Sequence, residues 1–245
     1  MAALMRVDET LAEIAEVRRA DQIPDLLGRV SAAYGMKTVA YLGTGTLDRR
    51  LPRREPYLAV TYSSAWVDHY RTKGYVKIDP VIQTGLRRLL PIDWTEFGGG
   101  DESLRRFFGE ATEFGLGRKG MSFPVYGHSG DRALFSVTAD FSEREWQWAR
   151  RTAFRQFPII ASHLHDAVLR TEGAARPQLR LSRREIECLQ WTSEGKTVWE
   201  CGMILGLSPH TVRCYLESAR HKLEASSNTH AVSIALKSGL LFDLP

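Results

Sequence analysis

The chain has 245 residues, of which 43% are hydrophobic and 25% are charged. This composition excludes a disordered or fibrous protein and provides enough apolar side chains for one large domain or two ordinary ones. No apolar run reaches the roughly 18 residues that a membrane helix needs, and the acidic amino terminus does not have the pattern of a signal peptide. We therefore expect a soluble, cytoplasmic protein that has no membrane partner.

Cysteine content argues against two further classes of protein, and net charge does not decide whether the chain binds nucleic acid. The three cysteines, Cys188, Cys201 and Cys214, include no CxxC pair, which argues against a disulfide framework and against a structural zinc site. From residue 172 onward nine Lys and Arg residues face eight acidic residues, a net charge of +1. Charge alone therefore does not predict nucleic-acid binding, and any such function depends on where the polar side chains lie.

The first part of the chain alternates helical and strand patterns. Apolar residues at helical spacing predict helices near residues 23–30 and 104–114. Strand-like runs lie at 37–42, 57–62, 121–126 and 133–139. Residues 127–131 predict a hairpin turn between the last two runs, and adjacent hairpin strands are antiparallel. The expected fold is α+β, with an α/β/α sandwich around an antiparallel sheet in this part of the chain.

A long helix and a linker close this first domain. Its apolar stripe is Trp146, Ala149, Ala153, Phe157, Ile160, Leu164 and Val168. Pro158 should kink or split the helix, because proline removes a helical hydrogen bond. Gly and Pro without periodicity then mark a linker at 172–180. The predicted domains are therefore 1–171 and 181–245, joined by this linker.

Residues 181–245 predict four helices with clear start and stop signals. Ser182 with Glu185, and Thr197 with Glu200, form capping boxes, and Ser208 precedes Pro209 at the favoured first helical position. Glycines at 195, 206 and 239 follow the first, second and fourth helices. The third helix has an apolar stripe at Val212, Leu216, Ala219 and Leu223. The expected structure is an all-α, four-helix domain.

A short helix, a glycine turn and a proline-initiated amphipathic helix form the helix-turn-helix pattern. With the stripe packed inward, five residues of the third helix face outward toward base edges: His210, Arg213, Cys214, Glu217 and Arg220. Four residues at helix starts suit contacts with phosphate: Lys196, Thr197, Ser208 and Thr211. These nine residues are the candidate DNA-binding residues. The alternative is an ordinary helical bundle whose polar faces only meet water.

The run from Leu181 to Trp191 (LSRREIECLQW), with Gly195-Lys196-Thr197 and Thr211-Val212-Arg213, resembles the LuxR-type helix-turn-helix signature over the whole C-terminal domain. Cys201 and Gly202 stand where the family usually has Ile and Ala, and Tyr215 where it often has His. Glycine at 202 should weaken its helix by about 1 kcal/mol relative to alanine.

Residues 10–170 resemble the autoinducer-binding domain of quorum-sensing LuxR-type receptors, which bind N-acyl homoserine lactones. Tyr62, Trp66, Tyr70, Asp79-Pro80, Trp94 and Gly120 carry the resemblance. It implies that Trp66 donates its indole N–H to the lactone carbonyl and that Asp79 accepts the amide N–H of the ligand. It also implies that Tyr62 donates to the acyl carbonyl, while Tyr70 and Trp94 enclose the lactone. Ser136 matches a position at which family members often place a hydroxyl facing the ligand.

The chemistry of the ligand is consistent with these residues. A homoserine-lactone head offers two acceptors and one donor, and leaving such a group unpaired in a dry pocket costs about 1–3 kcal/mol. Tyr62 and Trp66 supply two donors, and Asp79 supplies one acceptor. Each aromatic residue could instead be ordinary core packing, and Asp79 could instead cap a helix that starts at Pro80. Val81 indicates an apolar floor beneath the acyl group.

Three alternative functions are compatible with parts of the sequence to different degrees. A response-regulator receiver needs alternating βα units with an acidic pair, and the sequence lacks that order. Gly127-His128-Ser129-Gly130-Asp131 misses the last glycine of a nucleophile elbow, so we expect no catalytic residues, and we expect no cofactor and no metal. The serious alternative is a LuxR-type regulator that responds to an aryl lactone or a host-derived signal.

The sequence therefore predicts a quorum-sensing transcription factor that binds an N-acyl homoserine lactone and, as a homodimer, double-stranded DNA. The stripe at 146–168 and the helix at 229–238 could supply the dimer contacts, since an isologous interface needs one amphipathic surface on each copy.

Overall fold

The computed structural model describes residues 2–44, 56–98, 102–127, 131–172 and 181–241. Contacts within the chain divide it into two compact units, one made by the N-terminal part and one that contains residues 176–245. Each unit is described by itself. None of the helices in the described ranges is long and apolar enough to cross a membrane.

The N-terminal unit is built on a five-stranded antiparallel sheet. Its strands are β1 (Thr38–Thr44), β2 (Tyr57–Val60), β3 (Ile92–Asp93), β4 (Lys119–Tyr126) and β5 (Arg132–Ala139). The strand order is β2-β1-β5-β4-β3, and every neighbouring pair is antiparallel. The four predicted strands and the hairpin pairing of β4 with β5 are confirmed, whereas the two-residue strand β3 was not predicted. The central residues of the predicted turn, 128–130, lie outside the described residues.

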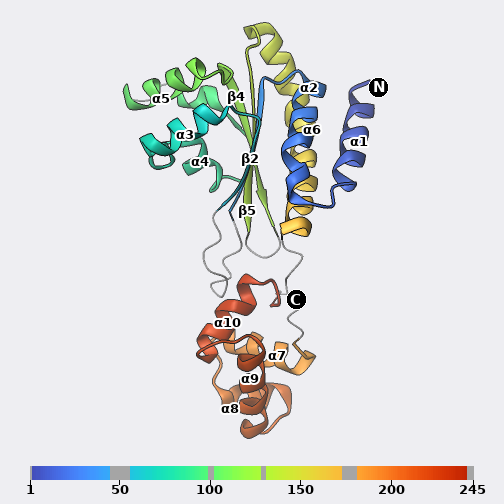
Figure 1. Cartoon of the computed structure of the whole chain (residues 1–245). Coiled ribbons are helices and arrows are strands. Elements are labelled where there is room, and N and C mark those ends of the chain that lie inside the picture. The colour runs from blue at the N-terminus through green and yellow to red at the C-terminus, as the bar shows by residue number, and fades with distance from the viewer. Residues whose placement is uncertain (1, 45–55, 99–101, 128–130, 173–180, 242–245) are drawn as a thin grey trace. The chain divides into compact units, whose positions relative to one another are not determined.

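Helices cover both faces of this sheet. One face carries α1 (Ala2–Ala15), α2 (Ile23–Tyr34) and α6 (Glu143–Glu172). The other carries α3 (Ser64–Lys73), α4 (Pro80–Gly85) and α5 (Glu102–Glu113) (Figure 1). Three short 3-10 turns lie at Ala20–Gln22, Tyr75–Lys77 and Trp94–Phe97. The α/β/α sandwich expected from the sequence is therefore confirmed.

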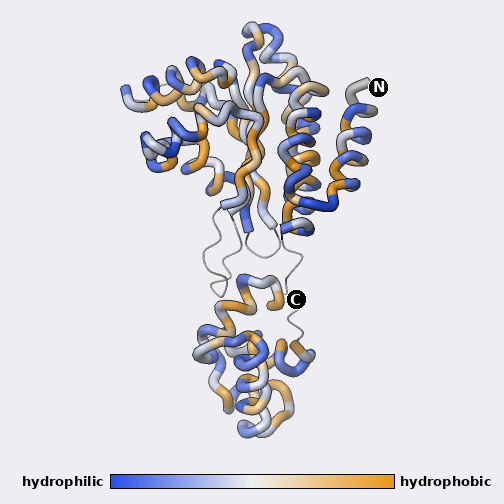
Figure 2. The backbone as a smooth tube through the Cα atoms, viewed as in Figure 1, coloured by the Kyte–Doolittle hydropathy of each residue, from blue (hydrophilic) through white to orange (hydrophobic). Residues whose placement is uncertain are grey.

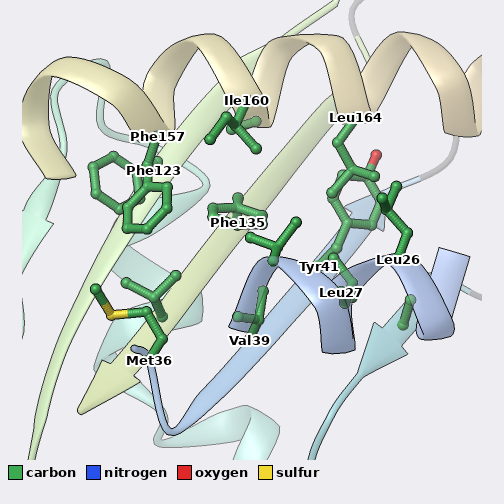
Figure 3. Close-up of a cluster of buried hydrophobic side chains, with 14 of the residues drawn as sticks. Leu26, Leu27, Met36, Val39, Tyr41, Phe123, Phe135, Phe157, Ile160 and Leu164 are labelled. Carbon is green, nitrogen blue, oxygen red and sulfur yellow. The ribbon is translucent and has the colours of Figure 1, made fainter. Parts of the chain in front are cut away.

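The main hydrophobic core lies between the sheet and the helices α2 and α6. Phe157 and Ile160 of α6 lie over Phe123 and Phe135 of the sheet, and Leu164 lies over Tyr41 (Figure 3). The rings of Phe123, Phe135 and Phe157 make tilted and edge contacts. All six side chains are at most 1% exposed. Strand residues alternate between faces, so burying this set on one face leaves the residues between them to face α3, α4 and α5.

Pro158 was predicted to kink or split the long helix α6, and the split is wrong because α6 is continuous from Glu143 to Glu172. Packing of its apolar stripe on the sheet outweighs the lost hydrogen bond. That packing also contradicts the suggested dimer contact, because every residue of the 146–168 stripe is buried in its own domain. The exposed apolar side chains of α6 are instead Trp148, Phe154 and Ile159. The helix ends at Glu172, and the rest of the predicted linker lies outside the described residues.

The C-terminal unit contains four helices. They are α7 (Arg183–Ser193), α8 (Val198–Leu205), α9 (Pro209–Lys222) and α10 (Asn228–Lys237). Both predicted capping boxes are present, and Ser208 accepts a hydrogen bond from the backbone N–H of Thr211 at 3.0 Å. Gly206 ends α8 in the left-handed conformation, with φ of 66°. The stripe of α9 is buried, as expected. Hydrophobic and hydrophilic residues alternate along the helices of both units (Figure 2).

The turn between α8 and α9 is close-packed at Gly202. The backbone N–H of Leu207 donates to the carbonyl of Gly202 at 2.8 Å. A Cβ atom at residue 202 would stand 2.7 Å from the carbonyl oxygen of Leu207. The glycine is therefore required by the turn, and its lower helix propensity relative to alanine is only part of the account.

A buried glutamate joins the first and third helices of this unit. Glu185 is 3% exposed and accepts hydrogen bonds from Lys222 Nζ at 2.9 Å and Ser218 Oγ at 2.7 Å, both on α9. It also accepts from the backbone N–H of Ser182 in the capping box. Burial alone would raise its pKa, but these bonds outweigh burial and lower the pKa of Glu185 to about 2. The carboxylate thus fixes α9 against α7.

Glu185→Gln should lower the free energy of unfolding by about 2 kcal/mol at neutral pH, because it removes charge-assisted hydrogen bonds. Since the folded-state pKa lies below the ordinary value of 4.5, this stabilisation is complete above pH 4.5 and is lost as the pH falls toward 2. Calorimetric melting of the full chain across this pH range should show the two proteins converging in acid.

Glu187→Gln on the same helix is the control, because the ion pairs of Glu187 with Arg183 and Arg184 lie within α7 and do not reach α9. If both variants lose equal stability, Glu185 does not join α7 to α9 as described.

Candidate functional site

The sheet face opposite the main core carries a row of four residues side by side. Strand register places Val60, Ala40, Ser136 and Ser122 next to one another on β2, β1, β5 and β4. Contacts from the helices identify the covering layer: Gly85 of α4 approaches Leu134 of β5, and Trp94 bonds to Ser122. All six of the predicted ligand-binding residues lie on this face or on the elements that cover it.

Trp66 is the centre of an aromatic cluster between α3 and α5. It is 2% exposed, and its ring lies 5.9 Å from Tyr70, 6.2 Å from Tyr75 and 5.5 Å from Phe114, centroid to centroid. Tyr62 packs against the same cluster. The four-residue spacing of Trp66 and Tyr70 therefore does place them on one helix face, as the sequence indicated.

Asp79 caps α4 and also binds Tyr70. Its Oδ1 atom accepts from the backbone N–H of Val81 at 2.9 Å and of Ile82 at 3.4 Å, and its Oδ2 atom accepts from the phenol of Tyr70 at 2.8 Å. The residue is 7% exposed, and burial raises its pKa to about 6 against the opposing effect of these bonds. The cap alternative is thus correct as local geometry. It does not exclude a ligand role, because a carboxylate has about four acceptor positions.

Among the hydrogen bonds of the described residues, none involves the indole N–H of Trp66 or the phenol of Tyr62, two donors that belong to this cluster. Burial, followed by the charge of Asp79, raises the pKa of Tyr62 above its usual value, so the phenol keeps its proton. The cluster therefore presents two donors beside a tyrosine, Tyr70, that binds one carboxylate.

Trp94, Ser122 and Ser136 form a hydrogen-bonded chain across the sheet face. Trp94 Nε1 donates to Ser122 Oγ at 2.9 Å, and Ser122 Oγ lies 2.7 Å from Ser136 Oγ. Ser122 is fully buried, and either of the two serine hydroxyls can be the donor in the bond between them. Trp94 therefore binds a serine that the sequence did not single out.

Nine residues were predicted to contact DNA, and the structure places them around the turn from α8 to α9. Lys196, His210, Arg213, Cys214 and Glu217 are exposed, as expected. Arg220 differs, because it is half-buried and donates to the carbonyl of Ala225 at 3.3 Å. The hydroxyls of Thr197 and Ser208 serve as helix caps, and Thr211 bonds to Ser208 at 2.8 Å. At these starts the free backbone N–H groups are therefore better placed than the hydroxyls to meet phosphate.

Comparisons with known proteins identify the family of each part of the chain. Residues 19–168 match the family model described as the autoinducer binding domain, and residues 179–235 match that of the bacterial regulatory proteins of the luxR family. The transcriptional activator protein RaiR of Rhizobium etli is 38% identical over 176 residues, covering 71% of this chain and 73% of RaiR. AhyR of Aeromonas hydrophila, also a transcriptional activator protein, is 29% identical over 248 residues, covering 95% of this chain and 91% of AhyR.

A solved structure has the same fold. The crystal structure of Escherichia coli SdiA aligns with a TM-score of 0.68 and 20% identity, covering 97% of this chain and 98% of SdiA. The two units and their matches define a transcription regulator with a small-molecule domain followed by a helix-turn-helix. The chain belongs to the LuxR family of quorum-sensing transcription regulators.

Gly120 gives a direct test of the Trp94 geometry. A Cβ atom at residue 120 would lie 2.3 Å from the Trp94 ring, so Gly120→Ala must displace the indole from Ser122. We expect a loss of about 1–3 kcal/mol in the free energy of unfolding, the usual cost of overpacking. Chemical denaturation of the full chain measures it.

Gly109→Ala on α5 is the matched control, because nothing lies within 4 Å of a Cβ at that position. There alanine should add up to about 1 kcal/mol of helix stability. Equal effects of the two substitutions would contradict the packing of Trp94 on Gly120.

Proposed function

We propose that this chain binds an N-acyl homoserine lactone on the sheet face covered by α3 and α4, and that the bound protein reads double-stranded DNA as a homodimer. The observation that carries the ligand proposal is a pair of donors, Trp66 and Tyr62, in the same cluster as Tyr70, whose phenol binds the buried carboxylate of Asp79. A homoserine-lactone head has two carbonyl acceptors and one amide donor, which is the complement of this set.

Each polar group of the ligand then has a partner. Trp66 donates to the lactone carbonyl, Tyr62 donates to the acyl carbonyl, and Asp79 accepts from the amide N–H. Ser136, whose Oγ atom lies 2.7 Å from Ser122 Oγ, offers a further hydroxyl beside the acyl group. Trp94 and Tyr70 enclose the head. The acyl chain lies along the apolar part of the same face, where Val81, 5% exposed, forms the floor.

A second candidate ligand class follows from a relative. A solved structure of SdiA, 21% identical and with a TM-score of 0.67, is described as a complex with octanoyl-rac-glycerol, which has no lactone. The alternative for this chain is therefore an aryl lactone or a host-derived molecule that offers acceptors to the same two donors. A panel of acyl lactones, aryl lactones and monoacylglycerols in a thermal-shift assay separates these classes, because a bound ligand raises the melting temperature with the logarithm of its excess.

For DNA binding, α9 enters the major groove with its first turns toward the base edges. Arg213 and His210 are the exposed residues best placed to read bases, and Lys196 contacts phosphate. A dimer would recognise two half-sites about one helical turn apart. Since bacterial DNA lies in the cytoplasm, the regulator acts there.

Asp79→Asn should weaken binding of N-octanoyl homoserine lactone by about ten- to several-hundredfold, since the ligand amide loses a charged acceptor. Tyr62→Phe should lose less, because it removes one neutral hydrogen bond and keeps the ring. Titration calorimetry on the full chain measures both affinities.

The same variants distinguish the ligand role from the cap role. Because the folded-state pKa of Asp79 is raised to about 6, the unliganded protein should lose stability as the pH rises from about 4 to 6, and Asp79→Asn should remove this loss. Should Asp79→Asn instead destabilise the unliganded protein while leaving lactone affinity intact, Asp79 is only a helix cap.

Arg213→Ala should cost about 1–3 kcal/mol of specific DNA affinity and relax preference at one base position, if Arg213 reads a base edge. Equal weakening on specific and random DNA would identify a phosphate contact instead. Arg183→Ala is the control, because Arg183 is exposed on α7 and pairs with Glu187. Selection from a random-sequence library, followed by affinity measurement at fixed salt, gives both results.

A further inference from the structure

Glu110 on α5 binds two residues from different elements with one carboxylate oxygen. Its Oε2 atom lies 2.6 Å from His69 Nε2 on α3, and it also accepts the phenol of Tyr75 from the 3-10 turn that follows α3. The side chains of His69 and Glu110 are only 25% and 22% exposed. The proposed ligand contacts do not include any of these three residues.

The bond between Glu110 and His69 forms one arm of this arrangement, because His69 packs against Trp66. The ring of His69 stacks on Trp66, at 5.9 Å and 30°, and on Phe114, at 4.7 Å and 28°, and these two rings also contact each other at 5.5 Å. Holding His69 by its Nε2 atom therefore fixes one wall of the space that the Trp66 indole occupies. The rotation of that indole sets where its N–H points.

The bond between Glu110 and Tyr75 forms the other arm, because the backbone of Tyr75 binds that of Asp79. The backbone carbonyl of Tyr75 accepts the backbone N–H of Asp79 at 2.8 Å and that of Ile78 at 2.9 Å. The Tyr75 ring also makes edge contact with Tyr70, whose phenol binds the Asp79 carboxylate. Fixing Tyr75 at its phenol thus fixes the backbone from which the buried carboxylate projects.

The Glu110 carboxylate is suited to accepting hydrogen bonds from both His69 and Tyr75. Hydrogen bonds from His69 and Tyr75 lower its pKa below the usual value, and Lys73 adds a favourable charge. Arg106 lies near Tyr75 on the same side. The group therefore stays ionised and can accept from both partners at neutral pH.

We propose that Glu110 is a positioning residue for the ligand head group: through His69 it sets the Trp66 donor, and through Tyr75 it sets the Asp79 acceptor. This inference rests on the proposed function, because it assigns the lactone carbonyl to Trp66 and the ligand amide to Asp79. Each arm governs a different atom of the ligand, so the two arms are separable by experiment.

The test compares two probes on the full chain. N-octanoyl homoserine lactone presents both the lactone carbonyl and the amide, whereas N-cyclopentyl octanamide keeps the amide and lacks the lactone carbonyl. His69→Phe retains the stacked ring and removes the bond to Glu110. It should weaken the lactone about tenfold and leave the cyclopentyl amide nearly unchanged. Tyr75→Phe removes the bond to Glu110 that positions Asp79, so it should weaken the binding of both probes by similar factors.

Glu110→Gln alters the bonds to both His69 and Tyr75, so it should weaken lactone binding more than His69→Phe or Tyr75→Phe does. Glu13→Gln is the matched control, because it breaks a comparable helix-to-helix ion pair, with Arg29 at 2.6 Å, between α1 and α2 on the opposite face of the sheet. It should leave both affinities unchanged. Melting temperatures of the unliganded variants show how much of each effect is general loss of stability.

The outcomes distinguish the positioning role of Glu110 from the proposed binding of an acyl homoserine lactone. If the wild-type protein binds the lactone and either His69→Phe or Tyr75→Phe binds both probes as the wild type does, the positioning role of Glu110 is overturned and the proposed function stands. If the His69→Phe loss is equal for the two probes, the arm to Trp66 is likewise overturned. A wild-type protein that binds no acyl lactone would overturn the proposed function, and the inference with it.

Discussion

Asp79 places a carboxylate where the residue is only 7% exposed, and the helices around it are arranged to satisfy that charge. A buried carboxylate without partners is costly, so its acceptor positions must be filled. The start of α4 supplies two backbone N–H groups and Tyr70 supplies a phenol. These bonds do not remove the whole cost of burial, since the pKa of Asp79 remains raised. An amide donor from a ligand would remove more of it, and the site is then more stable occupied than empty.

This constraint explains why the ligand domain has two separate apolar clusters. The core between the sheet and α6 is filled by aliphatic and aromatic side chains and carries the stability of the fold. The cluster around Trp66, on the other face, consists mainly of aromatic rings with polar atoms at their edges. Rings of this kind combine apolar packing with hydrogen bonding, which is what a site for a ligand with a polar head and an apolar tail requires.

Much of the fold could be predicted because the signals are local. Hairpin pairing of β4 with β5, both capping boxes and the Ser208-Pro209 start of α9 depend on residues within a few positions of each other. Elements whose extent depends on tertiary packing were predicted less well from the sequence. Pro158 was expected to interrupt α6, yet contacts along the whole helix hold it continuous. The strand β3 has only two residues and is defined by its partner β4, so it carries no periodicity of its own.

The candidate site likewise contains local features that the sequence indicated and long-range bonds that it did not. Asp79 before Pro80 indicated a cap, and the spacing of Trp66 and Tyr70 indicated a shared face; both depend on neighbours in sequence. The bond from Trp94 to Ser122 and the bonds from His69 and Tyr75 to Glu110 join residues 28 to 41 positions apart. No pattern in a single sequence specifies such pairs.

The turn between α8 and α9 carries a consequence for protein engineering. Consensus design replaces each residue by the one most frequent among relatives, and at residue 202 that would substitute alanine, a better helix former. In this chain the added Cβ atom would lie 2.7 Å from the carbonyl oxygen of Leu207, so the backbone of the turn between α8 and α9 would have to shift. Residue 202 and the turn after it are therefore better exchanged together than one at a time.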